Sequence, residues 1–168
     1  MFGLEQNLFD QLSRLKGEYD LQGVKAEFEA EGSSFRDLVR LRRITDKLNV
    51  PLFLKIGGVE ALRDIKDSLE VGVDGLIAPM VESPFGVKKF SDAVNSIYKN
   101  KSVHRSINIE THGSVCRADE ILEFARGRVE NITVGRTDLS SSYFDLSVTP
   151  DSDFIFELLA NLGRKVSD

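Results

Sequence analysis

The sequence predicts an α/β fold in which parallel strands alternate with helices, as in a (β/α)8 TIM barrel, with about five βα units in its 168 residues. Short apolar runs recur along the chain and are typical of buried strands. Segments with apolar residues at helical spacing separate these runs, as crossover helices separate the strands of a parallel sheet. Charged residues also share one face of several strands, which bears on the choice between a barrel and an open sheet.

The first two elements are a helix and a strand. Residues 4–17 predict an amphipathic helix, because leucines recur there at helical spacing. We expect residues 1–18 to be the N-terminal helix of a single, incomplete barrel-like domain that spans residues 1–168. The first strand is expected within residues 23–32, where charged residues alternate with Ala26 and Phe28. The charged residues of this strand are Lys25, Glu27 and Glu29.

The middle of the chain predicts two further βα units. A helix capped by Ser33 or Ser34 is expected to run to about Asn49. The apolar run at residues 50–57 predicts the second strand, and Gly57-Gly58 predicts the turn that follows it. A helix with apolar residues from Val59 to Leu69 should stop at Gly72, which suits a left-handed C-cap.

The remaining elements continue the alternation of strands and helices. Residues 73–81 predict the third strand, and Ser83-Pro84 predicts the start of a helix with apolar residues up to Ile97. Two apolar runs at 106–111 and 132–140 predict two more buried strands, with a helix near 118–126 between them. A last helix is expected at about 151–166. The sequence therefore predicts five strands and six helices.

Barrel and open-sheet architectures remain alternatives. The length favours a five-stranded, doubly wound open sheet, because a complete eightfold barrel usually needs about 250 residues. The strand faces favour a barrel: Lys25 and Glu27 share a face, as do Asn108 and Glu110. Burying such side chains against a helix would cost several kcal/mol each. We therefore expect barrel-type architecture, either truncated or closed by another chain.

Two acidic residues end the runs at 106–111 and 132–140. Glu110 and Asp138 should lie side by side, because a strand, a crossover helix and a parallel strand bring both strand ends to the same edge of the sheet. A divalent cation such as Mg²⁺ or Mn²⁺ would offset their repulsion, since oxygen ligands suit it. The alternative is that both acids only cap the helices that follow them.

Composition narrows the partners and the compartment. A net charge of −5 with no basic stripe argues against nucleic acid as a partner. No apolar stretch approaches the length of a membrane span, and the N-terminus does not resemble a signal peptide. The single cysteine, Cys116, excludes an internal disulfide and fits a reducing compartment, so we expect a cytoplasmic protein.

Three motifs resemble those of one enzyme family. Residues 73–83 (Val-Asp-Gly-Leu-Ile-Ala-Pro-Met-Val-Glu-Ser) resemble the Pro-Met-Val strand of the HpcH/HpaI aldolase and citrate lyase beta-subunit family. Residues 107–111 (Ile-Asn-Ile-Glu-Thr) resemble its Gln-Ile-Glu-Thr strand, and residues 135–140 (Gly-Arg-Thr-Asp-Leu-Ser) resemble its Gly-Pro-Ala-Asp-Leu-Ser loop. The motifs occur in the family's order at similar spacing, and the resemblance covers about residues 20–160.

The resemblance implies a phosphoenolpyruvate-binding-type barrel with lyase activity. A member of this family would use Mg²⁺ or a similar ion to hold a 2-oxo acid such as pyruvate while an enolate is stabilised. Glu110 and Asp138 would then be the metal ligands. Asn108 stands where the family often has a glutamine near the substrate, and Lys55 stands where many members have the arginine that contacts the keto oxygen.

The departures from the family pattern define the remaining candidates. The acid–histidine pair that family aldolases carry after the first strand is replaced by Glu29-Ala-Glu-Gly, with no histidine. Glu29 and His112 are therefore candidate proton-transfer residues, although a loop histidine is more often simply exposed. Arg136 could bind a substrate carboxylate or form a surface salt bridge.

Lys25 and Glu27 are candidate substrate-binding residues whose alternative role is a structural ion pair in the barrel lumen. A second hypothesis for the whole chain is a truncated, non-catalytic family member with a structural or regulatory role. In either case we expect a homo-oligomer, or a partner chain that completes the barrel.

Overall fold

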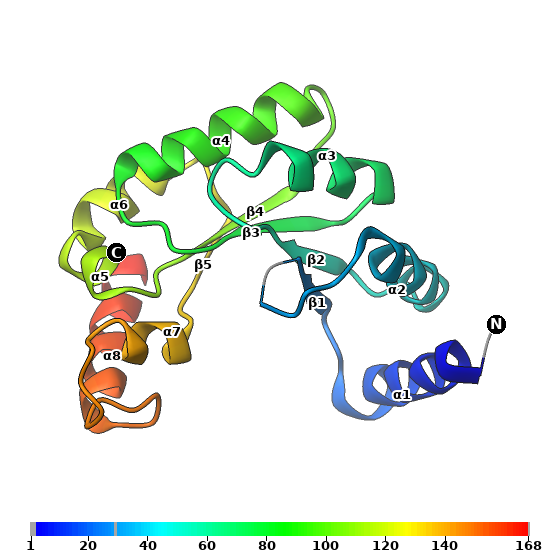
Figure 1. The fold of residues 1–168 in the computed structure, drawn as a ribbon, viewed down its shortest axis with the longest axis horizontal. Helices are drawn as coiled ribbons and strands as arrows, with labels where there is room; N and C mark the ends of the chain where they lie inside the picture. Colours follow the sequence, from blue (N-terminus) through cyan, green and yellow to red (C-terminus); the bar gives the residue numbers. More distant parts are fainter. Residues whose placement is uncertain (1–2, 29, 168) are drawn as a thin grey trace.

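The computed structural model describes residues 3–28 and 30–167, and it consists of one parallel sheet with helices between successive strands (Figure 1). The strands are β1 (Val24–Glu27), β2 (Leu52–Lys55), β3 (Gly75–Ala78), β4 (His104–Asn108) and β5 (Asn131–Thr133). The helices are α1 (Gly3–Tyr19), α2 (Phe35–Leu48), α3 (Leu62–Val71), α4 (Pro84–Tyr98), α5 (His112–Cys116), α6 (Ala118–Ala125), α7 (Arg136–Ser141) and α8 (Asp153–Ser167). No helix in the described ranges is long and apolar enough to cross a membrane.

The strand order settles the architecture. All neighbouring strands are parallel, and they lie in the sheet in the order of the chain, β1-β2-β3-β4-β5. A doubly wound open sheet would instead reverse its strand order at a switch point. The sequential order is that of a (β/α)8 barrel, so the barrel-type prediction is confirmed and the doubly wound alternative is wrong. In Figure 1, α3, α4 and α6 lie along one side of the sheet, whereas no helix covers the middle of the opposite side.

Alternation along the strands separates an apolar face from a polar face. Leu52 and Leu54 of β2, Leu76 of β3 and Ile107 of β4 are fully buried in a core that also contains Phe90 of α4. The intervening residues form the other face, and the register places Glu27 beside Lys55 and Asn108 beside Thr133. The helices thus cover the apolar face, and the charged residues lie on the face that would line a barrel interior.

Local signals explain three of the helix ends. Ser34, rather than Ser33, caps α2, and Ser34 and Asp37 form a reciprocal capping box. Gly72 ends α3 in the left-handed region (φ 73°), as its position predicts. Ser83 caps α4 by accepting a hydrogen bond from the Gly86 amide.

Several predicted boundaries are wrong. The helix expected from Val59 begins only at Leu62, because a turn at residues 57–61 is held by a hydrogen bond from the Gly57 amide to Asp64. The run at 132–140 is not one strand: β5 ends at Thr133, and α7 follows, so Asp138 lies in a helix. Residues Asn131 and Thr133 are exposed rather than buried, since β5 is an outer strand of the sheet.

Candidate active site

The predicted site residues gather mainly in one cavity at the carboxyl ends of the strands. This cavity has a volume of about 440 Å³ and lies over the polar face of the sheet. Its polar lining residues come from β1, β2, β4, and the segment from Thr133 to α7. They are Lys25, Glu27, Lys55, Asn108, Glu110, Thr133, Arg136, Thr137 and Asp138.

Glu110 is the most firmly held carboxylate in this cavity. It lies two residues beyond β4 and is 1% exposed. One of its oxygens accepts a hydrogen bond from the Met80 amide (3.0 Å), and the other accepts one from Asn108 Nδ2 (2.9 Å). Met80 adopts a left-handed conformation (φ 46°) that is uncommon for a side chain of its kind, and such strain persists only where the surroundings hold it. Glu110 is therefore fixed in direction.

Gly135 brings the start of α7 onto this carboxylate. A Cβ atom placed on Gly135 would lie 2.2 Å from Glu110 Oε2, so only glycine permits the backbone to approach so closely. Asp138 follows three residues later, in the first turn of α7, and lines the same cavity. The close approach explains how two acids from distant parts of the sequence reach one site.

Asn108 presents an oxygen that has no partner. The residue is 5% exposed, and its amide nitrogen donates to Glu110. Its Oδ1 atom is buried and accepts no hydrogen bond from any described residue. An unsatisfied buried acceptor costs about 1–3 kcal/mol. This oxygen is thus suited to a donor or a cation that a bound ligand would bring.

Lys55 and Glu27 form the charged floor of the cavity. Lys55 Nζ lies 3.7 Å from Glu27 and 4.0 Å from Asp138, and Lys25 Nζ lies 2.5 Å from the other Glu27 oxygen. Burial alone would raise the pKa of Glu27, but the hydrogen bond from Lys25 and the charges of both lysines lower it below its ordinary value. Glu27 is therefore ionised at neutral pH and holds Lys55 in the cavity.

The oxygen atoms that line the cavity provide part of the coordination that a hard divalent cation requires. Glu110, Asp138 and the free Asn108 oxygen are all oxygen donors, and Mg²⁺ is usually held by one or two carboxylates together with water and substrate oxygens. No group of three or more His, Cys, Asp or Glu side chains within the described residues is arranged to hold a metal ion. A cation here would therefore depend on ligands beyond the protein for much of its coordination.

Two predicted catalytic residues, Arg136 and His112, stand apart from this arrangement. Arg136 touches the cavity, but its guanidinium binds Asp151 (2.6 Å) and the Pro150 carbonyl oxygen (3.3 Å), so it fastens the α7–α8 connection. His112 is exposed at the start of α5, packs on the Tyr143 ring (4.7 Å between centroids) and does not line the cavity. Glu29 lies outside the described residues.

Two contributors escaped the sequence-based reasoning. Met80 acts through its backbone amide, and a backbone donor cannot be recognised from the type of residue. Gly135 acts through the absence of a side chain. Both lie within the motifs quoted above, and a glycine directly before an acidic helix start was the one available signal for a close approach.

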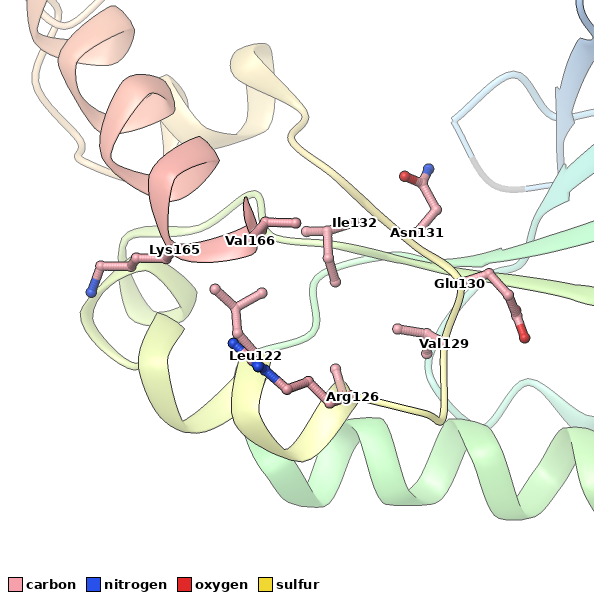
Figure 2. A pocket seen from close by; sticks show the side chains of 9 residues that line it. Leu122, Arg126, Val129, Glu130, Asn131, Ile132, Lys165 and Val166 are labelled. Atoms are coloured by element: carbon pink, nitrogen blue, oxygen red, sulfur yellow. The ribbon is translucent and has the colours of Figure 1, made fainter. Parts of the chain in front are cut away.

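A second cavity, of about 200 Å³, lies elsewhere and contains none of the predicted site residues. Figure 2 shows Leu122 of α6, Arg126 directly after α6, Ile132 of β5, and Lys165 and Val166 of α8 around it. Its lining is mainly apolar, with one carboxylate, from Glu130, and one amide, from Asn131. The cavity at the strand ends is therefore the better candidate for chemistry, although the second is the more apolar of the two.

The fold and the site together define an α/β enzyme-like scaffold with its polar groups at the carboxyl ends of parallel strands. The family model of HpcH/HpaI aldolase/citrate lyase matches residues 50–153. The chain therefore belongs to the HpcH/HpaI aldolase/citrate lyase family, as the three motifs predicted. No curated protein matches its sequence.

Solved structures support the same fold at low sequence identity. An HpcH/HpaI aldolase from Desulfitobacterium hafniense DCB-2 is 18% identical, with a TM-score of 0.75 over 94% of this chain and 69% of that chain. Citrate synthase SbnG is also 18% identical (TM-score 0.74; 94% of this chain and 69% of that chain). A family protein from Burkholderia cenocepacia J2315 is 15% identical (TM-score 0.75) and covers 99% of this chain and 82% of that chain.

Proposed function

We propose that this protein is a carbon–carbon lyase of the aldolase or citrate lyase type, dependent on Mg²⁺ or Mn²⁺, that acts on a 2-oxo acid or its adduct. The observation that carries the proposal is the placement of Glu110 and Asp138 on one cavity, beside the unpartnered oxygen of Asn108. Family membership supports the lyase class.

Glu110 and Asp138 would hold the cation. When bound, a divalent cation supplies Lewis acidity that stabilises the charge of an enolate. Glu110 is pre-oriented for this role, because Met80 and Asn108 each donate a hydrogen bond to it. Asp138 is half-exposed, so its direction depends more on what occupies the cavity.

Lys55 would bind the anionic end or the keto oxygen of the substrate. Its side chain is 11% exposed, and its ammonium group lies between Glu27 and Asp138 in the lining of the cavity. The ion pair with the ionised Glu27 carboxylate orients Lys55 in the cavity. The Asn108 oxygen could accept a hydrogen bond from a hydroxyl of the substrate.

Calorimetry with Mg²⁺ or Mn²⁺, with and without pyruvate or oxaloacetate, tests the metal site. We expect binding that Glu110→Gln and Asp138→Asn each weaken by at least about 10-fold, since each removes a charged ligand. Glu123→Gln is the matched control, because this exposed acid of α6 lies outside the cavity. Circular dichroism of each variant verifies folding. Absence of binding in the wild type, or equal binding in all variants, would exclude the proposal.

A structural or regulatory role is the second candidate, and the open sheet favours it. No described strand pairs with the outer edges of β1 and β5, so another chain could add to either edge. A homo-oligomer or a barrel-completing partner would provide such a chain. Release of pyruvate from a hydroxylated 2-oxo acid by the purified protein, lost in Glu110→Gln, would exclude a purely structural role.

A further inference from the structure

Helix α1 carries an apolar stripe that the rest of the fold leaves exposed. Helix α1 packs on α2 and Leu12 is buried, but Leu4, Leu8, Leu15 and Tyr19 are 83%, 39%, 40% and 67% exposed. At roughly 100° per residue, these four side chains fall within about 60° of one another around the helix axis. Figure 1 shows α1 beside α2 at the margin of the fold, away from the middle of the sheet.

The opposite side of α1 is polar. Gln6, Asp10 and Ser13 are exposed there, and Gln6 donates a hydrogen bond to Asp10 (2.9 Å). The apolar residues are therefore not scattered over the surface but are confined to one face of a helix of 17 residues. A continuous apolar face of this kind normally meets a partner.

The spacing of the stripe is symmetric about the middle of the helix. When two copies of α1 are laid antiparallel, with the twofold axis between Gln11 and Leu12, Leu4 lies opposite Tyr19 of the second copy and Leu8 lies opposite Leu15. Every exposed apolar residue then has an apolar counterpart, as an isologous contact requires. Gln11, near the axis, can pair with the same residue of the other copy. The antiparallel arrangement also opposes the two helix dipoles favourably.

The area of the stripe is enough for a modest dimer. At roughly 100 Å² of apolar surface per leucine side chain and 200 Å² per tyrosine, the exposed fractions leave about 300 Å² per copy. Two stripes and a polar rim of similar size would bury roughly 1,000–1,200 Å², which is the lower range for specific interfaces. The association should therefore be reversible and depend on concentration.

We propose that α1 is a homodimerisation helix, which pairs antiparallel with α1 of a second copy through Leu4, Leu8, Leu15 and Tyr19. This inference does not depend on the proposed enzymatic function, because the stripe lies outside the cavity at the strand ends.

Sedimentation equilibrium over micromolar concentrations tests the dimer. We expect a monomer–dimer equilibrium in the wild type and a dissociation constant at least about 100-fold higher in Leu8→Glu/Leu15→Glu, because the contact would bury unpaired carboxylates. Gln6→Glu/Ser13→Glu is the matched control: it adds the same charge to the opposite side of α1 and should leave the equilibrium unchanged. A wild type that stays monomeric throughout, or a dimer that survives Leu8→Glu/Leu15→Glu, overturns the proposal.

Disulfide trapping tests the orientation. Cys116 is exposed, so the variants are made with Cys116→Ser. Leu4→Cys and Tyr19→Cys proteins, one of them tagged, are mixed and oxidised, and we expect mixed disulfides to dominate. Leu4→Cys alone should trap poorly, because antiparallel pairing separates its two copies by about 22 Å. Efficient trapping of Leu4→Cys with itself would indicate a parallel contact and would overturn the antiparallel arrangement.

Discussion

At the scale of single residues, the site depends on groups that hold Glu110 in place. The carboxylate is buried, and its partners are the Met80 amide and the Asn108 side chain. Gly135 packs directly on it, so the absence of a side chain at this position is as important as the acid itself. Stability and ligand binding should therefore be coupled at Gly135.

We expect Gly135→Ala to lower the free energy of unfolding by about 1–3 kcal/mol and to weaken metal binding, since the new methyl group would displace Glu110. Urea unfolding and calorimetry measure the two effects. Gly17→Ala is the control: a methyl group there meets open space on a helix, and it should be neutral or stabilising. Equal stability of Gly135→Ala and the wild type would show that the contact with Glu110 is loose.

Glu27 gives the protein a pH-dependent contribution to stability. Its pKa is lowered in the folded state from an ordinary value of 4.5, so its ion pairs stabilise the fold above that pH. This contribution is lost as the pH falls below 4.5 and passes through the lowered pKa of the folded state, because protonation removes the charge that binds Lys25 and Lys55.

We expect Glu27→Gln to destabilise the protein by about 1–3 kcal/mol at pH 7, since one buried charged partner is removed. The difference from the wild type should shrink as the pH falls below 4.5. Urea unfolding of both proteins from pH 7 to pH 3 measures it. A difference that does not change with pH would show that the ion pairs do not contribute.

At the scale of elements, short helices account for most of the departure from expectation. Helices α5 and α7 contain 5 and 6 residues, too few for a periodic apolar pattern to be recognised. The run at 132–140 is apolar enough to suggest one strand, but the chain turns at Gly135 into α7. Asp138 therefore reaches the cavity from a helix, although the cavity itself is at the predicted edge of the sheet.

Helix caps are well predicted by the residues around them in the sequence. The sequence left Ser33 and Ser34 as alternatives for the start of α2, and the structure selects Ser34 through its reciprocal bonds with Asp37. The choice depends on the backbone direction at the end of the preceding loop, where the Ser33 amide donates to the Glu27 carbonyl oxygen.

We expect Ser34→Ala to lower the free energy of unfolding by about 1 kcal/mol, because the Asp37 amide loses its acceptor. Ser33→Ala should have a much smaller effect and serves as the matched control. Thermal or urea unfolding of the two variants measures the contrast. Equal losses would assign the cap to both serines and contradict the observed geometry.

At the scale of the whole molecule, the sequential strand order and the polar inner face of the sheet both indicate barrel-type architecture. The face of the sheet opposite α3, α4 and α6 carries Lys25, Glu27 and Lys55. These residues form ion pairs with one another and lie outside the apolar core. The outer edges of β1 and β5 have no described strand beside them. The α1 stripe offers an association surface on a helix rather than on a strand edge, and the trapping experiment distinguishes the two.

The sequence by itself determined the alternation of strands and helices, the family, and the acids that reach the cavity, because periodicity, caps and motifs are local properties of the chain. Only the tertiary structure decided which groups surround these acids. Met80 and Gly135 act through the backbone, Arg136 is drawn to Asp151, and His112 packs on Tyr143. Such contacts join residues far apart in the sequence, and they depend on directions that only the packed sheet and helices fix.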